Sequence, residues 1–341
     1  MSERPPPGPA PTNPRLRALG MLLIANFYWG LSFPVIKAVV LTLGRLQPQA
    51  RGGYLTTMAV APRFVLAFFL LALWPRRAAT PASGTRGRLM RGEWKQGLII
   101  GGFGAVGMML QIDGLRFTAA STSAFLTQFY AILIPLYLAV RSRCWPTTTT
   151  VISCLLVLWG VALLGRFDWR AMHLGRGEWE TLLSSVFFMG QILSLGNRAY
   201  EGNRPRAITL VMFGAEAAVF TVAALAAAPS AHALAAPWTD GPWVGLTLIL
   251  TIFCTMGSFS LMNAWQPKIT PTEAGLVYCV EPIFGSLLAL CLPALFSRWA
   301  GIVYPNETAT SNLLLGGGLI TLANILIQLR PPPAPTDPVA A

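Results

Sequence analysis

Ten apolar runs of about 20 residues follow one another along this chain, with mostly short polar connections between them. A helix rising about 1.5 Å per residue needs about 20 apolar residues to cross the hydrocarbon core of a bilayer. The runs lie near residues 20–41, 54–74, 96–115, 122–140, 148–165, 179–198, 207–228, 242–265, 272–296 and 311–329. The sequence therefore predicts an all-α integral membrane protein with ten transmembrane helices.

The amino-acid composition agrees with a chain that lies mostly in lipid. Hydrophobic residues make up 54% of the chain and charged residues 11%, whereas a soluble domain carries about 25% charged residues. The formal net charge of +12 would suggest nucleic-acid binding in a soluble protein. Here the basic residues lie mainly in short connections between apolar runs, where they orient a membrane protein. We therefore expect no nucleic-acid partner.

Residues that usually bind metals and cofactors are sparse. The five cysteines show no C-x-x-C spacing, and the two histidines, His173 and His232, fall in predicted loops. The chain also contains no Gly-Lys dipeptide, which excludes a Walker-type ATP site. We expect no metal, no cofactor and no step driven by ATP bound to this chain.

Lysines and arginines divide unequally between the two sides that ten spans would create. The side holding both chain ends carries more of them, including Arg15, Arg17 and Arg141, and such an excess marks the cytoplasmic side. We expect both termini in the cytoplasm and the protein in the plasma membrane, the inner membrane of a bacterium. Residues 1–18 and 331–341 include proline-rich ends and are expected to form disordered cytoplasmic tails.

An internal repeat divides the chain into two halves. Shifting the sequence by 150 residues lays residues 115–132 over residues 265–282. The identical pairs used for this alignment are Thr122 with Thr272, Ala124 with Ala274, and Leu126 with Leu276. Residues 19–166 and 167–330 would each hold five spans, and an odd number gives the halves opposite orientations. Inverted repeats of this kind build many secondary transporters, with binding sites near the midplane where the halves meet.

Four stretches give the chain a resemblance to a known family. They are YWGLSFPVIK (residues 28–37), Arg63-Phe64 opening the second apolar run, GLRFTAASTSAFLTQFYAILIPL (residues 114–136), and Glu281-Pro282. In this order and at these spans, they resemble the drug/metabolite transporter superfamily, in its EamA-like branch of ten-helix carriers. The resemblance implies a transporter in which each half is one EamA-like repeat. Asp113, Glu216 and the long arginine-bearing connection after the fifth span depart from the family pattern, so the resemblance does not imply a substrate.

Three ionisable residues fall at the same depth inside predicted spans. Arg63, Glu216 and Glu281 each lie about 13 to 14 Å from a span end, close to the midplane of a core about 30 Å thick. A charge there costs at least roughly 2.5 to 3.5 kcal/mol and persists only with a partner or in a wet cavity. We expect Arg63 to pair with Glu216 or Glu281, leaving the other carboxylate to bind a cationic or zwitterionic substrate, or a proton. The alternative is a fixed ion pair that only supports packing.

Other polar and aromatic side chains inside the spans are weaker candidates for the same site. Lys37 either extends to the outer interface or contacts substrate. Asp113 and its repeat partner Asn263 lie near span ends and are expected to form capping or gate hydrogen bonds. The candidate lining residues are Trp29, Ser32, Gln111, Thr127, Gln128, Tyr130, Gln191 and Tyr278. Each of these could instead form a hydrogen bond between helices.

These features predict a secondary-active transporter, an exporter, of a small organic metabolite, amino acid or drug-like solute. The two five-helix halves would alternate access around a midplane site, with protons as a candidate coupling ion. A membrane-embedded transferase generally needs clustered carboxylates or histidines, which the chain lacks, and a lipid flippase would need a groove open to lipid. Both remain alternatives, and a homodimer is left open.

Overall fold

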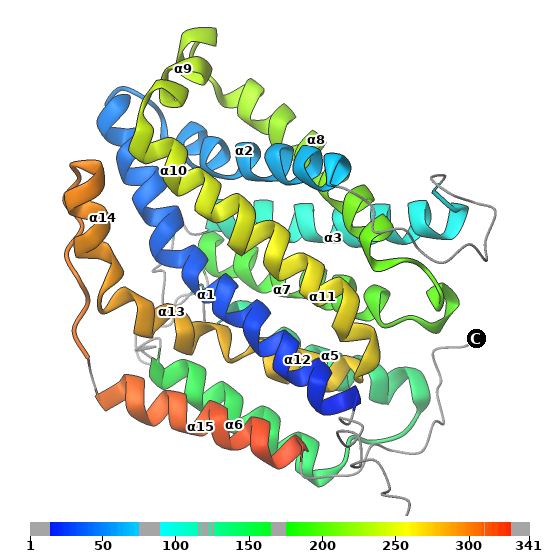
Figure 1. The fold of residues 1–341 in the computed structure, drawn as a ribbon. Helices are drawn as coiled ribbons and strands as arrows, with labels where there is room; N and C mark the ends of the chain where they lie inside the picture. The colour runs from blue at the N-terminus through cyan, green and yellow to red at the C-terminus, as the bar shows by residue number, and fades with distance from the viewer. Residues whose placement is uncertain are drawn as a thin grey trace, which may run out of the picture.

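The computed structural model describes residues 14–74, 89–114, 117, 123, 126–164, 175–309 and 311–328. Within these ranges every regular element is helical (Figure 1). The first half contains α1 (Pro14–Leu46), α2 (Gly52–Leu73), α3 (Arg91–Gly114), α5 (Tyr130–Ser142) and α6 (Thr148–Leu164). The second half contains α7 (Arg176–Leu195), η1 (Arg198–Tyr200), α8 (Pro205–Ala227), α9 (Ala231–Ala235), η2 (Ala236–Thr239), α10 (Gly241–Ile249), η3 (Leu250–Gly257), α11 (Ser258–Trp265), η4 (Gln266–Lys268), α12 (Pro271–Tyr278), α13 (Glu281–Ala289), α14 (Leu292–Ala300) and α15 (Ser311–Gln328).

A helix or a chain of helices lies at each of the ten predicted runs. Five of these are long and apolar enough to cross a membrane: α1, α2, α3, α8 and the continuous segment Gly241–Lys268. A sixth would be formed by Pro271–Ala289 together with α14, which are bent by 58° relative to each other. Helices α5, α6 and α15 are apolar but shorter. The count of ten transmembrane helices therefore stays a prediction.

Helix α1 is described from Pro14 onward, so residues 14–18, which were assigned to a tail, are helical. The start of helix α12 follows from local sequence. Helix α12 begins after Thr270, whose side chain accepts a hydrogen bond from the Glu273 amide while Glu273 caps the Thr270 amide in return. The remaining tail residues, and Thr122 and Ala124 of the repeat, lie outside the described residues.

Small residues allow the long helices to approach closely. A Cβ atom on Gly97 of α3 would lie 2.5 Å from Cβ of Val211 in α8, and one on Gly101 would lie 3.0 Å from the Met212 carbonyl oxygen. A Cβ on Gly160 of α6 would lie 2.7 Å from the carbonyl oxygen of a glycine in α15. Gly97 and Gly101 of α3 thus face α8, as small residues do between packed membrane helices.

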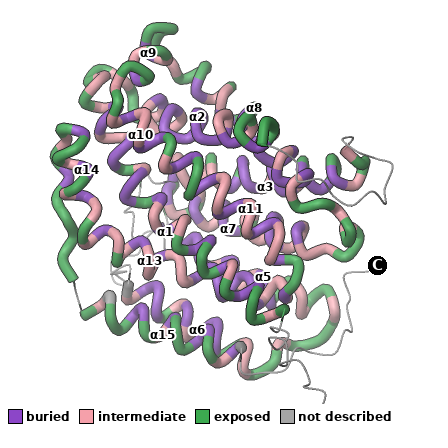
Figure 2. The backbone as a smooth tube through the Cα atoms, in the orientation of Figure 1, coloured by how far each residue is buried: buried purple, intermediate pink, exposed green. Residues whose placement is uncertain are grey.

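The outer surface of the helical assembly is apolar. Buried residues follow the interfaces between helices, while many exposed positions face outward (Figure 2). Large hydrophobic side chains such as Val222 and Trp159 are exposed on helix sides, and Trp74 and Trp145 are exposed at helix ends. A surface of this kind suits lipid, with tryptophan at the interface between the bilayer and water.

Candidate substrate-binding site

The ninth predicted span is broken near its middle. Helix α12 ends at Tyr278 and α13 begins at Glu281. Between them the amides of Cys279 and Val280 bond to carbonyl oxygens only three residues earlier, at 3.2 and 3.1 Å. Pro282, the second residue of α13, cannot donate a backbone hydrogen bond, so the ladder cannot run through this point. The ninth apolar run of the sequence is therefore two helices rather than one continuous helix.

The fourth predicted span is interrupted at the corresponding place. A turn at Gln128 and Phe129 precedes α5, and the Phe129 amide bonds to the Leu126 carbonyl oxygen at 3.2 Å. Inside α5, Pro135 leaves the Ala131 carbonyl without its usual helical donor. The Cys154 thiol of α6 donates to this oxygen at 3.3 Å instead. Subtracting 150, the offset of the predicted repeat, from residues 279–280 of the break in the ninth span gives residues 129–130, which overlap the end of this turn.

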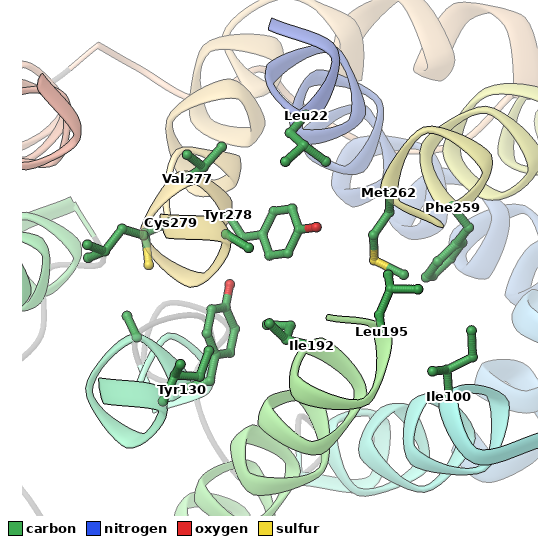
Figure 3. Packing of buried hydrophobic residues seen from close by; sticks show 14 of the residues in the cluster. Leu22, Ile100, Tyr130, Ile192, Leu195, Phe259, Met262, Val277, Tyr278 and Cys279 are labelled. Atoms are coloured by element: carbon green, nitrogen blue, oxygen red, sulfur yellow. The ribbon is translucent and has the colours of Figure 1, made fainter. Parts of the chain in front are cut away.

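Two tyrosines reach from these breaks into one region between the helices. Tyr130 is the first residue of α5 and Tyr278 the last of α12, and Figure 3 shows both side chains pointing into the region beside Ile192 of α7. The Tyr278 hydroxyl donates to Oε1 of Gln266 at 2.9 Å. In turn, Nε2 of Gln266 donates to the Ile192 carbonyl oxygen at 2.7 Å. This chain of bonds fixes the orientation of the Tyr278 ring.

Trp29 of α1 closes one side of the same region. Its ring lies edge-on to Tyr278, with centroids 5.3 Å apart, and edge-on to Phe259 of α11 at 5.5 Å. Ser32, one turn further along α1, is also buried. Helices α1, α11 and α12 therefore present a set of aromatic edges and faces close to the two breaks.

Three more polar residues belong to the two breaks: Glu281 in the ninth span, and Thr127 and Gln128 in the fourth. Glu281 is the first residue of α13, is half-buried, and is within electrostatic range of Tyr130. Thr127 accepts a hydrogen bond from Nε2 of Gln111 at 3.0 Å, which matches the alternative of a bond between helices. Gln128 is buried, and its Oε1 has no hydrogen-bond partner among the described residues.

Arg63 and Glu216 form a second polar cluster, between α2, α3, α7 and α8. Both are buried, at 5% and 0% exposure, and each lies within electrostatic range of the other. The guanidinium of Arg63 contacts Sδ of Met108 at 3.1 Å. Gln191 of α7 donates to the Ile100 carbonyl oxygen at 3.3 Å.

The expected ion pair of Arg63 is not formed. In the part of the chain that the structure describes, neither Glu216 nor Glu281 makes an ion pair or hydrogen bond with Arg63. The physical reason is the direction of the Arg63 side chain, which extends toward Met108 on α3 rather than directly across to α8. The three charges predicted to share one depth thus belong to two clusters.

Comparison with known proteins relates the chain to a family of transporters. Residues 16–166 match the EamA-like transporter family. A protein of Archaeoglobus fulgidus called "Uncharacterized transporter" is 24% identical over 313 residues, covering 92% of this chain and 85% of that protein. These similarities support the drug/metabolite transporter superfamily for this chain. It is an integral membrane protein and a membrane transporter, and its family points away from an enzyme.

A solved crystal structure shares the fold of this chain. The two structures superpose with a TM-score of 0.63 and cover 92% of this chain and 97% of the other. Their sequences are 17% identical, so the likeness concerns the arrangement of helices.

Lys37 of the transporter lies outside both clusters. It is exposed, and its ammonium nitrogen is 5.0 Å from the centre of the Tyr304 ring, in the loop after α14. Burial raises the pKa of Tyr304 to about 12, so the ring that faces the cation is a neutral phenol. The structure therefore places the Lys37 ammonium against an aromatic ring in the loop after α14.

The polar residues at the span ends of the transporter join helices to each other. Asp113 accepts a hydrogen bond from Nη2 of Arg176 at 2.5 Å, and Asn263 donates to Oγ1 of Thr209 at 2.9 Å. The sequence did not single out Gln266 or Phe259 as site residues. Gln266 directly follows an apolar run, and Phe259 lies within it. Only the packing of α11 on α1 and α12 brings Gln266 to Tyr278 and Phe259 to Trp29.

Proposed function

We propose that this transporter is a secondary-active carrier that moves a small organic solute by alternating access. The substrate would bind between the breaks of the fourth and ninth spans, near Tyr130, Tyr278 and Glu281. The observation that carries the proposal is the occurrence of a break in corresponding spans of both halves, brought together where α5 packs against α12. Interrupted helices at corresponding positions are the recurring architecture of binding sites in secondary transporters.

The packing of the helices supports two inverted five-helix repeats. If α1, α2, α3, α5 and α6 correspond to α7, α8, the α10–α11 segment, α12–α13 and α15, three contacts join corresponding helices: α2 with α8, α5 with α12, and α6 with α15. The contact of α3 with α7 has its counterpart in that of α11 with α1. A two-fold axis in the membrane plane would generate this set of contacts.

The ion pairs agree with the proposed topology of ten spans with both termini in the cytoplasm. Arg45 at the end of α1 bonds to Asp240 at the start of α10, and Arg204 before α8 bonds to Glu93 at the start of α3. The topology places the first pair outside and the second in the cytoplasm. Each pair therefore joins residues on one side only, as a bilayer requires.

The chemistry of the region favours a substrate with an amino group, such as an amino acid or another cationic or zwitterionic metabolite or drug-like solute. Aromatic rings attract cations over their faces, and Glu281 supplies a carboxylate next to Tyr130. Tyr130 and Tyr278 are 5% and 3% exposed, so protein encloses the region. This enclosure favours a carrier over a lipid flippase, which needs a groove open to lipid. Export is the direction we propose, in the inner membrane of a bacterium.

Counterflow in proteoliposomes tests this proposal. Vesicles preloaded with one unlabelled compound from a panel of amino acids and organic amines are diluted into the same labelled compound, with and without a pH gradient. We expect transient accumulation of at least one compound, its loss in Glu281→Gln, and normal counterflow in Glu201→Gln, whose carboxyl is exposed in the loop before α8. Unchanged counterflow in Glu281→Gln would remove Glu281 from the site. Labelled lipid moving between leaflets, with no solute counterflow, would indicate a flippase.

A further inference from the structure

Glu216 is the most completely buried acidic side chain of the polar clusters. Its exposure is 0%, and both carboxyl oxygens lack a hydrogen-bond partner among the residues described. An ionised carboxylate that loses its water contacts and gains no hydrogen bond costs several kcal/mol, whereas the neutral acid costs far less. The arrangement seen here therefore accommodates a carboxylic acid rather than a carboxylate.

Among the described residues, one cation, Arg63, acts electrostatically on Glu216. Its Oε1 would lie only 2.5 Å from a Cβ atom placed on Gly104 of α3, so the carboxyl sits directly against glycine backbone. Nε2 of Gln191 would lie 2.8 Å from the same Cβ position. Of the charged and titratable groups described on the helices packed around α8, Arg63 on α2 acts on Glu216, and Cys254 on η3 acts on Arg63.

Arg63 is itself incompletely paired. Its Nε has no hydrogen-bond partner in the described part of the chain, and one terminal nitrogen contacts the thioether of Met108. A thioether sulfur is only a weak acceptor. A carboxylate at Glu216 would be a far stronger acceptor for the same guanidinium, with two charge-assisted hydrogen bonds available.

We propose that Glu216 is a proton-binding site separate from the substrate region, and that loss of its proton draws Arg63 from Met108 into an ion pair with Glu216. The O–H bond of the acid breaks, the proton leaves to water, and the electron pair stays on the carboxylate that Arg63 then holds. Because Arg63 and Glu216 lie on α2 and α8, which join the two halves, a proton gradient would bias the packing of those halves. Only this last step, the coupling to transport, rests on the proposed function.

Infrared difference spectroscopy of the purified full-length protein tests proton binding without any substrate. We expect wild-type protein to show the C=O stretching band of a buried carboxylic acid that disappears as pH rises. The band should be absent from Glu216→Gln at every pH and present in Glu216→Asp, which keeps the acid. Glu201→Gln, which removes an exposed carboxyl, should leave the band unchanged. If no carboxylic-acid band of the wild-type spectrum is lost in Glu216→Gln, the proposal is overturned.

The partner is tested by Arg63→Gln in the same measurement. Loss of the guanidinium removes the group that stabilises the carboxylate, so the Glu216 band should persist to a pH higher by about one unit or more. If the pH midpoint of the Glu216 band is the same in Arg63→Gln and wild type, the proposed movement of Arg63 from Met108 to Glu216 is overturned. These outcomes do not depend on transport: a titrating Glu216 band with no counterflow of any solute would reject the proposed carrier and keep the proton site.

Discussion

Trp29 of α1 lies edge-on to Tyr278 of α12, with ring centroids 5.3 Å apart, although 249 residues separate them along the chain. The contact joins the first span of one half to the broken span of the other. It places an aromatic wall beside the site proposed for the substrate and orients the ring that Gln266 also holds.

Replacing Trp29 should weaken substrate binding more than it weakens the fold. In Trp29→Ala, the loss of the aromatic edge should raise the half-saturating concentration for counterflow, by a factor of about 5 or more if an aromatic contact is worth about 1 kcal/mol. Trp29→Phe should retain most of the affinity. The check is a concentration series with the solute identified by counterflow, alongside a melting curve for each variant. Equal affinity in Trp29→Ala and wild type would place the substrate elsewhere.

The close contact of α3 with α8 should be sensitive to a single methyl group. Gly97→Ala would put its Cβ 2.5 Å from Cβ of Val211 and should cost about 1 to 3 kcal/mol through overpacking. Gly102→Ala lies on the same helix with no atom within 4 Å of its Cβ, and it should leave stability unchanged or slightly raised. Thermal unfolding in detergent should therefore separate the two variants. Equal melting temperatures would contradict the helix contact.

The pair between Glu93 and Arg204 should stabilise the start of α3. The Glu93 side chain is fully buried and accepts hydrogen bonds from Nε and Nη2 of Arg204 at 2.6 and 2.8 Å, and from the Met90 amide at 2.9 Å. These bonds raise the pKa of Arg204, which remains a cation at every pH that a cell reaches. Glu93→Gln leaves the hydrogen-bonding shape but removes the charge, and should lower stability by about 1 to 3 kcal/mol.

The matched control for Glu93→Gln is Glu180→Gln. Glu180 also accepts from an arginine, Arg176, but the Glu180 side chain is 18% exposed whereas that of Glu93 is 0% exposed, so the loss should be no more than about 1 kcal/mol. A larger effect at Glu180 than at Glu93 would contradict the importance assigned to burial.

Native cysteines can report the proposed topology. Cys144, between α5 and α6, and Cys291, between α13 and α14, are exposed, whereas Cys154, Cys254 and Cys279 are buried. With both termini in the cytoplasm, Cys291 would face outward and Cys144 inward. A membrane-impermeant maleimide added to intact spheroplasts should label a variant whose only cysteine is Cys291. A variant whose only cysteine is Cys144 should be labelled only after the membrane is opened. The reverse pattern would invert the topology, and labelling of both from outside would break the ten-span count.

Much of the fold could be read from hydrophobic run lengths. A chain in lipid must satisfy its backbone hydrogen bonds internally, so each apolar run of membrane length becomes a helix, and helices lie at all ten predicted places. Motif resemblance at Arg63 and Glu281-Pro282 also led to the correct superfamily. These are local properties, which are set by neighbours along the chain.

The arrangement of the polar groups could not be read in the same way. Equal depth suggested that Arg63, Glu216 and Glu281 meet, but depth says nothing about which way a side chain turns around its helix. Arg63 turns to Met108, Glu281 lies at the break near Tyr130, and Lys37 turns to Tyr304. The sequence by itself determined the class of protein, the places of the helices and the candidate residues, because lipid imposes length and polarity along one dimension. Only the tertiary structure decided which candidates share a site, because helix rotation and the close contacts at glycine are properties of packed pairs.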